Sequence, residues 1–357
     1  MIPKKGEALH PAREPLETLA ELRQIIGEFN FAAQNSQYTV QNLAILVPNG
    51  VATSVTNITL SYKDVNGATQ TVTQPLAVNA SMAYATATFT GLTMFVPTND
   101  SANLDVYAGT PTVASGATSG AAINVKIDEG NANTSTDNTF RAVNSAGAPM
   151  VVTNGGYVQT LASGGTFYVR KSIPTFAVKS MNSSVPGSPL YQFSISADPA
   201  GAIEWSKLSF TVATTSATVT GVYLTNDSSG TQLEDNSNAT TTSTAITIDL
   251  TKNANQPKYQ QIAAGTSVTY DLYGTVTGYT TGSTVTISLA SDNSLPTGNA
   301  ATNGNFSADG TVAAGGSDNI TWSDRSGVSG SHTISTADWT NGYLLKNFTG
   351  AQISYSK

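Results

Sequence analysis

Hydrophobic and polar residues alternate from residue 29 onward, with the period of two that half-buried β-strands show. Phe29, Phe31 and Ala33 open the first alternating run, and Asn66-Gly67 is a typical hairpin turn. About seven such runs fall within about 100 residues, with turn residues roughly every 8 to 12 positions. This pattern predicts an antiparallel sandwich of the immunoglobulin-like type.

The same hydrophobic pattern occurs twice. The matched blocks are 29–33 with 193–197, 40–47 with 205–212, 55–62 with 219–226, 104–108 with 270–274, and 123–127 with 285–289. Because five blocks keep one order and an offset of about 164 residues, they indicate a tandem duplication. The predicted fold is all-β: two tandem immunoglobulin-like antiparallel β-sandwiches, a short N-terminal helical or extended arm and a small C-terminal β extension.

Changes in composition predict five segments. They are a charged N-terminal arm (1–28), module 1 (29–128), a β-rich connector (129–165), module 2 (166–292), and a polar loop with the C-terminal β extension (293–357). Short apolar runs such as Phe140–Val143 predict that the connector adds strands to the sandwiches. Phe167–Val169 is the expected first strand of module 2.

The arm differs in chemistry from the rest of the chain. It holds nine of the 39 charged residues, and Gly27 follows a short stripe at helical spacing. The apolar residues of this stripe are Leu16, Leu19, Leu22 and Ile26. A helix this short is marginal alone, so the stripe predicts contacts with another subunit, as a helix or as a strand added to a sheet edge. The alternative is a leader or vector-derived segment.

Composition narrows the function classes. The net charge is −7 and the pI about 4.8, and the sequence has no basic cluster, which argues against a nucleic-acid partner. With no cysteine, disulfides and thiolate metal sites are impossible. No apolar run approaches the length of a membrane span, which is about 18 residues or more. No signal peptide is visible either, which leaves the export route open.

Two motifs near the C-terminus carry a resemblance. Trp322–Ser326 and Asp338–Tyr343, together with the module opening Phe-x-Phe-x-Ala followed by Val-x-x-Leu-x-Ile, are similar to repeats in large uncharacterised bacterial cell-surface proteins. Those proteins are abundant in ultra-small bacteria, and their modules read as immunoglobulin-like sandwiches. The resemblance implies an extracellular or cell-surface location, and the family has no established catalytic residues to carry over.

Catalytic chemistry has little support in the sequence. His10 and His332 are the two histidines, and neither lies in a recognisable catalytic motif. Asp105 and Asp271 could form a glycosidase pair, but their equivalent places in the two repeats favour a structural role. We therefore expect no enzyme and no cofactor apart from calcium.

Calcium is the metal that the sequence favours. Asp128, Glu129 and Asp137, with Asn131 and Asn133, gather hard oxygen donors between the modules. Residues 226–227 with 234–236 form a second, weaker cluster. The competing interpretation of both is ordinary Asn- and Asp-rich turns, since no EF-hand spacing is present.

Aromatic residues offer one further binding hypothesis. Trp205, Trp322 and Trp339 could form a platform on which sugars stack. However, Trp205 aligns with Val40 at a core-facing position, and Trp322 and Trp339 could pack together.

The sequence as a whole favours a structural protein. The first prediction is an extracellular subunit of a surface layer, fibre or filament, whose partners are copies of itself. The first alternative is an adhesin or carbohydrate-binding surface protein, with surface glycans as partners. The second alternative is a phage virion protein, which would account for the missing signal peptide.

Overall fold

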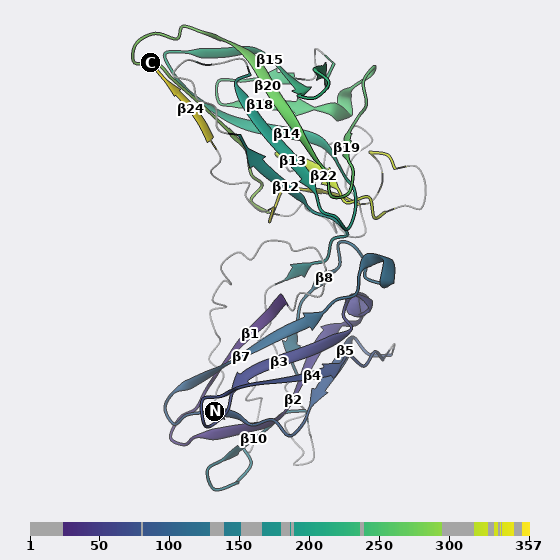
Figure 1. Ribbon diagram of the computed structural model, residues 1–357. Coiled ribbons are helices and arrows are strands. Elements are labelled where there is room, and N and C mark those ends of the chain that lie inside the picture. Colours follow the sequence, from purple (N-terminus) through teal and green to yellow (C-terminus); the bar gives the residue numbers. More distant parts are fainter. Residues whose placement is uncertain are drawn as a thin grey trace. The chain divides into compact units, whose positions relative to one another are not determined.

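The described part of the computed structural model divides at Val169 and Arg170 into two compact units, the first unit and the second unit. Both are built almost entirely of antiparallel strands, which confirms the all-β sandwich prediction (Figure 1). The structure describes residues 24–79, 81–128, 139–150, 166–179, 186, 189–235, 239–294, 318–327, 332–334, 336, 338–345 and 352–357.

Two sheets form the first unit. One has the order β1-β7-β3-β4, and the other is built on β2, which pairs with β5, β6, β9 and β10. A short β8–β11 pair completes the unit. The strands are β1 (Gln24–Ala32), β2 (Tyr38–Pro48), β3 (Asn57–Lys63), β4 (Thr69–Pro75), β5 (Tyr84–Phe89), β6 (Met94–Val96), β7 (Ser101–Gly109), β8 (Ala122–Ile123), β9 (Lys126–Ile127), β10 (Arg141–Asn144) and β11 (Phe167–Tyr168), with 3-10 turns η1 (Asn49–Ser54) and η2 (Val113–Ser115).

Two sheets also form the second unit. One has the order β12-β13-β20-β15-β16, and the other is built on β14, which pairs with β18, β19, β21 and β22. The strands are β12 (Pro174–Val178), β13 (Tyr191–Ala197), β14 (Ile203–Thr215), β15 (Thr218–Asn226), β16 (Thr231–Gln232), β17 (Ala239–Thr241), β18 (Ala245–Asp249), β19 (Gln260–Ile262), β20 (Ser267–Thr277), β21 (Thr284–Leu289), β22 (Ile320–Ser323), β23 (Trp339–Asn341) and β24 (Gln352–Ser356), with one 3-10 turn, η3 (Leu250–Lys252).

Strand order and register confirm the duplication. The order β1-β7-β3-β4 recurs as β13-β20-β15-β16, and the long strands β2 and β14 each pair with four others. Ile45 on β2 pairs with Ile127, and its counterpart Phe210 on β14 pairs with Leu289. One framework of pairings therefore serves both units, and β12 is an additional edge strand in the second.

Matching positions fill the two cores. Leu43 and Leu208 are both fully buried at equivalent places, and so are Val40 and Trp205. Phe29 on β1 and Phe193 on β13 are likewise buried in their own units. Alternation along the strands therefore predicted the inward faces correctly.

The duplication extends beyond the predicted modules. β10 pairs with β2 across a bulge next to Val40, and β22 pairs with β14 across a bulge next to Trp205, the counterpart of Val40. The last strands match too, since β11 pairs with Ile123 and β24 with its counterpart Val285. The strand of the predicted connector and the C-terminal extension are thus equivalent parts of the two repeats. Phe167–Val169, predicted to open module 2, lies in the first unit.

The N-terminal boundary also differs from the prediction. β1 begins at Gln24, and Ile26 is buried in the core of the first unit. The structure thus corrects the assignment of Ile26 to an arm that contacts other subunits, because its side chain completes the local core. The other three residues of the predicted stripe, Leu16, Leu19 and Leu22, lie outside the described residues.

Candidate functional site

A hairpin near the C-terminus supports a cluster of buried, mutually bonded polar side chains. β22 and β23 pair in register through Trp322 and Thr340, and every residue of both strands is buried. Residues 324–338 separate the two strands, where the first unit has only a short turn after β10. The described part of this insertion folds back against β14.

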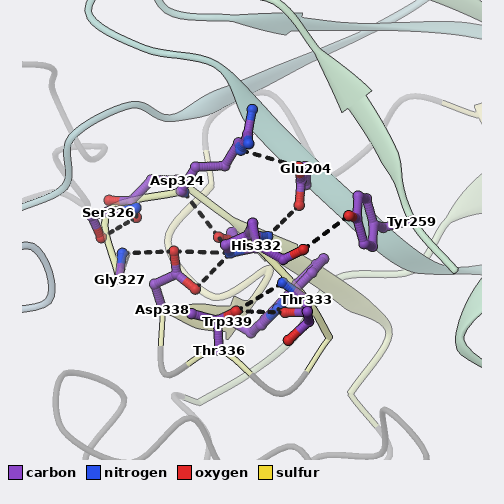
Figure 2. Close-up of polar contacts among 12 residues, drawn as sticks. Glu204, Tyr259, Asp324, Ser326, Gly327, His332, Thr333, Thr336, Asp338 and Trp339 are labelled. Atoms are coloured by element: carbon purple, nitrogen blue, oxygen red, sulfur yellow. Dashed lines mark hydrogen bonds and ion pairs between the residues drawn. The ribbon is translucent and has the colours of Figure 1, made fainter. Parts of the chain in front are cut away.

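His332 lies at the centre of the cluster (Figure 2). Its Nδ1 bonds a carboxylate oxygen of Glu204 on β14, and its Nε2 lies 2.8 and 3.0 Å from the two oxygens of Asp338. The Ser323 Oγ is 3.1 Å from the same Nε2. Only 5% of His332, 1% of Glu204 and 5% of Asp338 is exposed, so water does not screen these charges.

Neighbouring groups fix the three central side chains. Arg325 forms an ion pair with Glu204, with 3.1 Å between Nε and Oε1, although the contact lacks hydrogen-bond geometry. The Gly327 N–H donates to Asp338 at 2.9 Å. On the other side, the Tyr259 hydroxyl donates to the carbonyl of His332 at 3.0 Å (Figure 2). The contacts come from β14, β22, the insertion and Tyr259 just before β19, so the cluster joins segments that are distant in sequence.

The electrostatics favour a charged imidazole. Burial lowers the pKa of His332, but the hydrogen bonds to Asp338 and Glu204 outweigh it and raise the pKa to about 9. For Asp338, burial raises the pKa, and the bonds to His332 and Gly327 outweigh burial and hold it below its usual value. At neutral pH the centre is therefore an imidazolium between two carboxylates.

The connectivity of Ser323, His332 and Glu204 is that of a serine-histidine-acid triad. Two features oppose that chemistry. An imidazole whose pKa is about 9 is already protonated at neutral pH and cannot accept the serine proton. Ser323 is also fully buried, and its Oγ accepts the Arg325 N–H at 2.9 Å. The arrangement holds the insertion against β14, and the serine is closed to a substrate.

The first predicted calcium cluster falls mostly outside the described residues, where Glu129 and Asp137 lie. Asp128 is described, and its N–H donates to Ala44 at 2.9 Å, which extends the pairing along β2. Within the described ranges, no group of three or more histidine, cysteine, aspartate or glutamate residues is arranged to hold a metal. Calcium at this cluster remains a prediction.

The second predicted cluster bonds the backbone. Glu234 is buried and both its oxygens lie 3.2 Å from the Leu224 N–H. Asp235 accepts the N–H groups of Ala254 and Asn255 at 2.6 and 3.1 Å. These two carboxylates, which follow β16, satisfy backbone amides of β15 and of the loop after η3, which is the structural interpretation of the cluster.

The three tryptophans do not form a surface platform. Trp205, Trp322 and Trp339 are all at most 2% exposed, which corrects the sugar-stacking hypothesis for them. Each indole N–H has an internal acceptor: the Tyr270 hydroxyl, the Asn341 carbonyl and the Thr333 carbonyl respectively. Trp205 lies in the core, as its alignment with Val40 predicted.

The outward face of the β15–β20 pair carries two tyrosines. The Tyr223 and Tyr273 rings stack with centroids 5.0 Å apart and planes 11° apart, and Tyr223 is 36% exposed. Next to them, the Gln192 amide donates to Asp271 at 2.7 Å, and burial raises the pKa of Asp271. Asp105, the counterpart of Asp271, also has a pKa raised by burial. Asp105 and Asp271 therefore have matching environments at equivalent positions, which fits a structural role in the sheet.

Comparisons with known proteins give no family. No family model matches the chain, and no curated protein matches it. In the described part of the chain, no helix is long and apolar enough to cross a membrane.

Two solved structures show faint likeness. One is a biofilm-associated protein, BSP domain, at 10% identity and a TM-score of 0.18, covering 81% of this chain and 59% of that one. The other is the N-terminal CBM22-1-CBM22-2 tandem domain from Paenibacillus barcinonensis Xyn10C, at 10% identity and a TM-score of 0.16, covering 71% of this chain and 78% of that one. The chain thus spans about three fifths of the first structure. At these TM-scores neither likeness supports a functional argument.

Proposed function

We propose that this protein is a non-enzymatic structural subunit of the cell surface or extracellular space that assembles with its own copies by strand addition. The observation that carries the proposal is β4, an edge strand of seven residues with the sequence Thr-Gln-Thr-Val-Thr-Gln-Pro. Among the described strands, β4 pairs only with β3. It carries no charged residue, and charged edge residues are one means by which sheet proteins prevent strand addition.

Backbone register shows which groups face the open edge. The Asp64 N–H bonds the Ala68 carbonyl, and the Leu76 N–H bonds the Thr56 carbonyl, so even-numbered residues of β4 bond toward β3. The N–H and C=O groups of Thr71, like those of Thr69 and Thr73, consequently point away from β3. They offer an incoming strand a regular row of donors and acceptors.

The equivalent edge of the second unit is blunted. β16 is only two residues long, its ladder with β15 ends at the bond from the Leu233 N–H to the Leu224 carbonyl, and the Glu234 carboxylate then takes the Leu224 N–H. In the first unit, by contrast, exposed hydrophobic side chains flank β4: Val65 before it, and Val78 and Met82 after it, are 60–65% exposed. Of these two equivalent edges, that of the first unit is therefore the more suited to strand addition.

The geometry of the contact decides the kind of assembly. Pairing of β4 with β4 of a second copy is isologous and closes a dimer, whereas a fibre requires a heterologous contact. We propose that the predicted arm, with Leu16, Leu19 and Leu22, supplies the heterologous partner of β4. The arm must end before Gln24, because β1 begins there.

Substitution at Thr71 tests the proposal. Thr71→Pro removes an outward N–H while leaving the β3 ladder intact, and Thr71→Val keeps the N–H and serves as the matched control. We expect sedimentation and negative-stain microscopy to show polymers for the intact chain and Thr71→Val, and folded monomers for Thr71→Pro and for a chain lacking residues 1–23. Polymers that survive Thr71→Pro contradict the role of β4. Dimers without fibres contradict the role of the arm.

The stacked tyrosines favour carbohydrate binding as a second candidate. Tyr223 and Tyr273 present aromatic surface beside the half-buried Gln192 amide, a combination that suits a sugar ring and its hydroxyls, and the buried Asp271 carboxyl holds that amide in place. A glycan array with the intact chain and a Tyr223→Ala variant tests this candidate. Binding that disappears in the variant supports it, and absence of binding by the intact chain removes it.

A further inference from the structure

A second buried polar cluster closes the base of the loop between β21 and β22. Asp292 accepts the N–H groups of Asn319, Ile320 and Gly342 at 2.6, 3.2 and 2.7 Å. Asp318 accepts the Asn341 side-chain amide at 2.7 Å, and this amide also donates to the carbonyl of Ser294 at 2.8 Å. The loop ends are thus held together around two carboxylates and the carbonyl oxygen of Ser294.

One oxygen of this cluster has no partner. Asp318 is 8% exposed, and its Oδ2 is buried without any hydrogen-bond donor. A buried carboxylate oxygen without a donor is costly, so such an atom points to a missing partner. Burial raises the pKa of both Asp318 and Asp292, and the charge of Asp318 raises that of Asp292 further. Lys207 offsets this only in part, by lowering the pKa of Asp318.

Two features of the sequence fit this cluster: a glycine at position 342 and an equivalent loop in the first unit. A side chain at position 342 would place its Cβ 3.0 Å from the Asp292 Oδ2 and 2.9 Å from Ile320, so Gly342 allows the close approach. The loop also has a counterpart in the first unit. The Ala290 N–H bonds Ser209 as the Asp128 N–H bonds Ala44, so 291–318 corresponds to the loop that holds the predicted calcium donors.

We propose that Asp318 Oδ2, Asp292 and the Ser294 carbonyl oxygen bind a divalent cation of the calcium type. The donors are all hard oxygens, which calcium prefers, and the described residues at the site contribute no imidazole or thiolate that would favour zinc. The cation supplies the partner of Asp318 Oδ2 and balances the two buried charges. It also joins the ends of the loop to β22 and to the residue after β23.

Terbium luminescence tests this site in the intact protein. Trp205, Trp322 and Trp339 are the only tryptophans and all lie in the second unit, and the Trp322 indole bonds the carbonyl of Asn341 beside the site. Energy transfer from an excited tryptophan to terbium therefore detects an ion that is bound at this site. We expect saturable luminescence that calcium displaces, and a loss of affinity of about tenfold or more in Asp318→Asn. The control Asp64→Asn, in a turn of the first unit, should behave like the parent.

Calcium-dependent thermal unfolding provides a second measurement that needs no variant. Because a ligand that binds only the folded state raises the midpoint, millimolar calcium should raise the transition followed by tryptophan fluorescence. No terbium signal together with an unchanged midpoint overturns the proposal. Luminescence that persists undiminished in a folded Asp318→Asn protein also overturns it. The proposal is also overturned if Asp318→Asn raises stability and calcium has no effect on the parent. In that case a buried proton or a water, and not a cation, is the partner of the Asp318 Oδ2.

Discussion

The hairpin after β10 and the hairpin of β22 and β23 occupy the same place in the two repeats but close differently. In the first unit, the Asn144 side chain accepts the N–H groups of Ala146 and Ala148 at 3.0 and 2.9 Å, and Gly147 adopts a positive φ of 76°. All of these contacts are local. In the second unit, closure depends on His332 and Glu204, which are 128 residues apart.

The difference shows how one strand framework accommodates a long insertion. A tight Asx turn satisfies its own backbone and leaves its polar groups near solvent. A 15-residue insertion between Ser323 and Trp339 must instead bury polar groups, and each buried charge then needs a partner. The second hairpin is therefore held in place by an ion cluster whose members depend on one another, and we expect it to be more sensitive to mutation and to pH.

Removal of the His332 imidazolium, the positive charge at the centre of the ion cluster, should have the largest effect. His332→Ala leaves Glu204 and Asp338 buried without their shared partner, which should destabilise the second unit by about 3–5 kcal/mol. Chemical denaturation followed by tryptophan fluorescence measures this, because all three tryptophans lie in the second unit. The first unit, followed by native-state hydrogen exchange, should keep its stability. An unchanged tryptophan transition would show that Arg325 alone neutralises the cluster.

The free energy of unfolding of the second unit should also depend on pH, between about pH 6.5 and pH 9. The folded pKa of His332 is about 9, above the ordinary value of 6.5, so the folded state binds the proton more tightly. This contribution is complete below about pH 6.5 and is lost as the pH rises through about 9. The thermal midpoint of the tryptophan transition should fall across that range, by an amount that corresponds to a few kcal/mol.

The His332→Ala variant is the control for the pH prediction. The charged or titratable groups that face the imidazole are Glu204, Asp338 and, through Glu204, Arg325, with the Tyr259 ring beside them. The variant should show a flat profile between pH 6.5 and 9, because the group that titrates there is gone. The same slope in parent and variant would assign the effect to another group.

The sequence revealed the repeat but not its full extent. Alternation identified the inward positions of β1 and β13, because strand faces follow a period of two whatever the tertiary context. Ile26 was misassigned since a four-residue stripe also fits a helix, and only pairing with β7 decides the matter. The relation of β10 to β22 was hidden because their loops differ in length, so the offset between the repeats changes after about residue 127.

The His332 cluster could not be predicted from local patterns. Glu204 and Asp338 lie 128 and 6 residues from His332. The contact between His332 and Glu204 depends on the pairing of β22 with β14. The signals present in the sequence were the tail motif around Trp322–Ser326 and the acidic residue directly before the core-facing Trp205, at the start of its strand. Asp318 was missed for the same reason, since its neighbours Asp292 and Asn341 are brought together by the fold.

The turn of the first unit should show the smallest effect and thereby sharpen the comparison. Asn144→Ala removes two side-chain hydrogen bonds in a partly exposed turn, which should cost about 1 kcal/mol. The loss should appear as faster hydrogen exchange in β10 and β2, with no change in the tryptophan transition and no dependence on pH between 6.5 and 9. Because the remaining backbone bonds of the turn, from Gly147 to Asn144 and from Met150 to Ala142, are local, the hairpin can re-form without the side chain. A loss comparable to that of His332→Ala would mean that the local turn is as indispensable as the ion cluster, and the distinction between the two hairpins would fail.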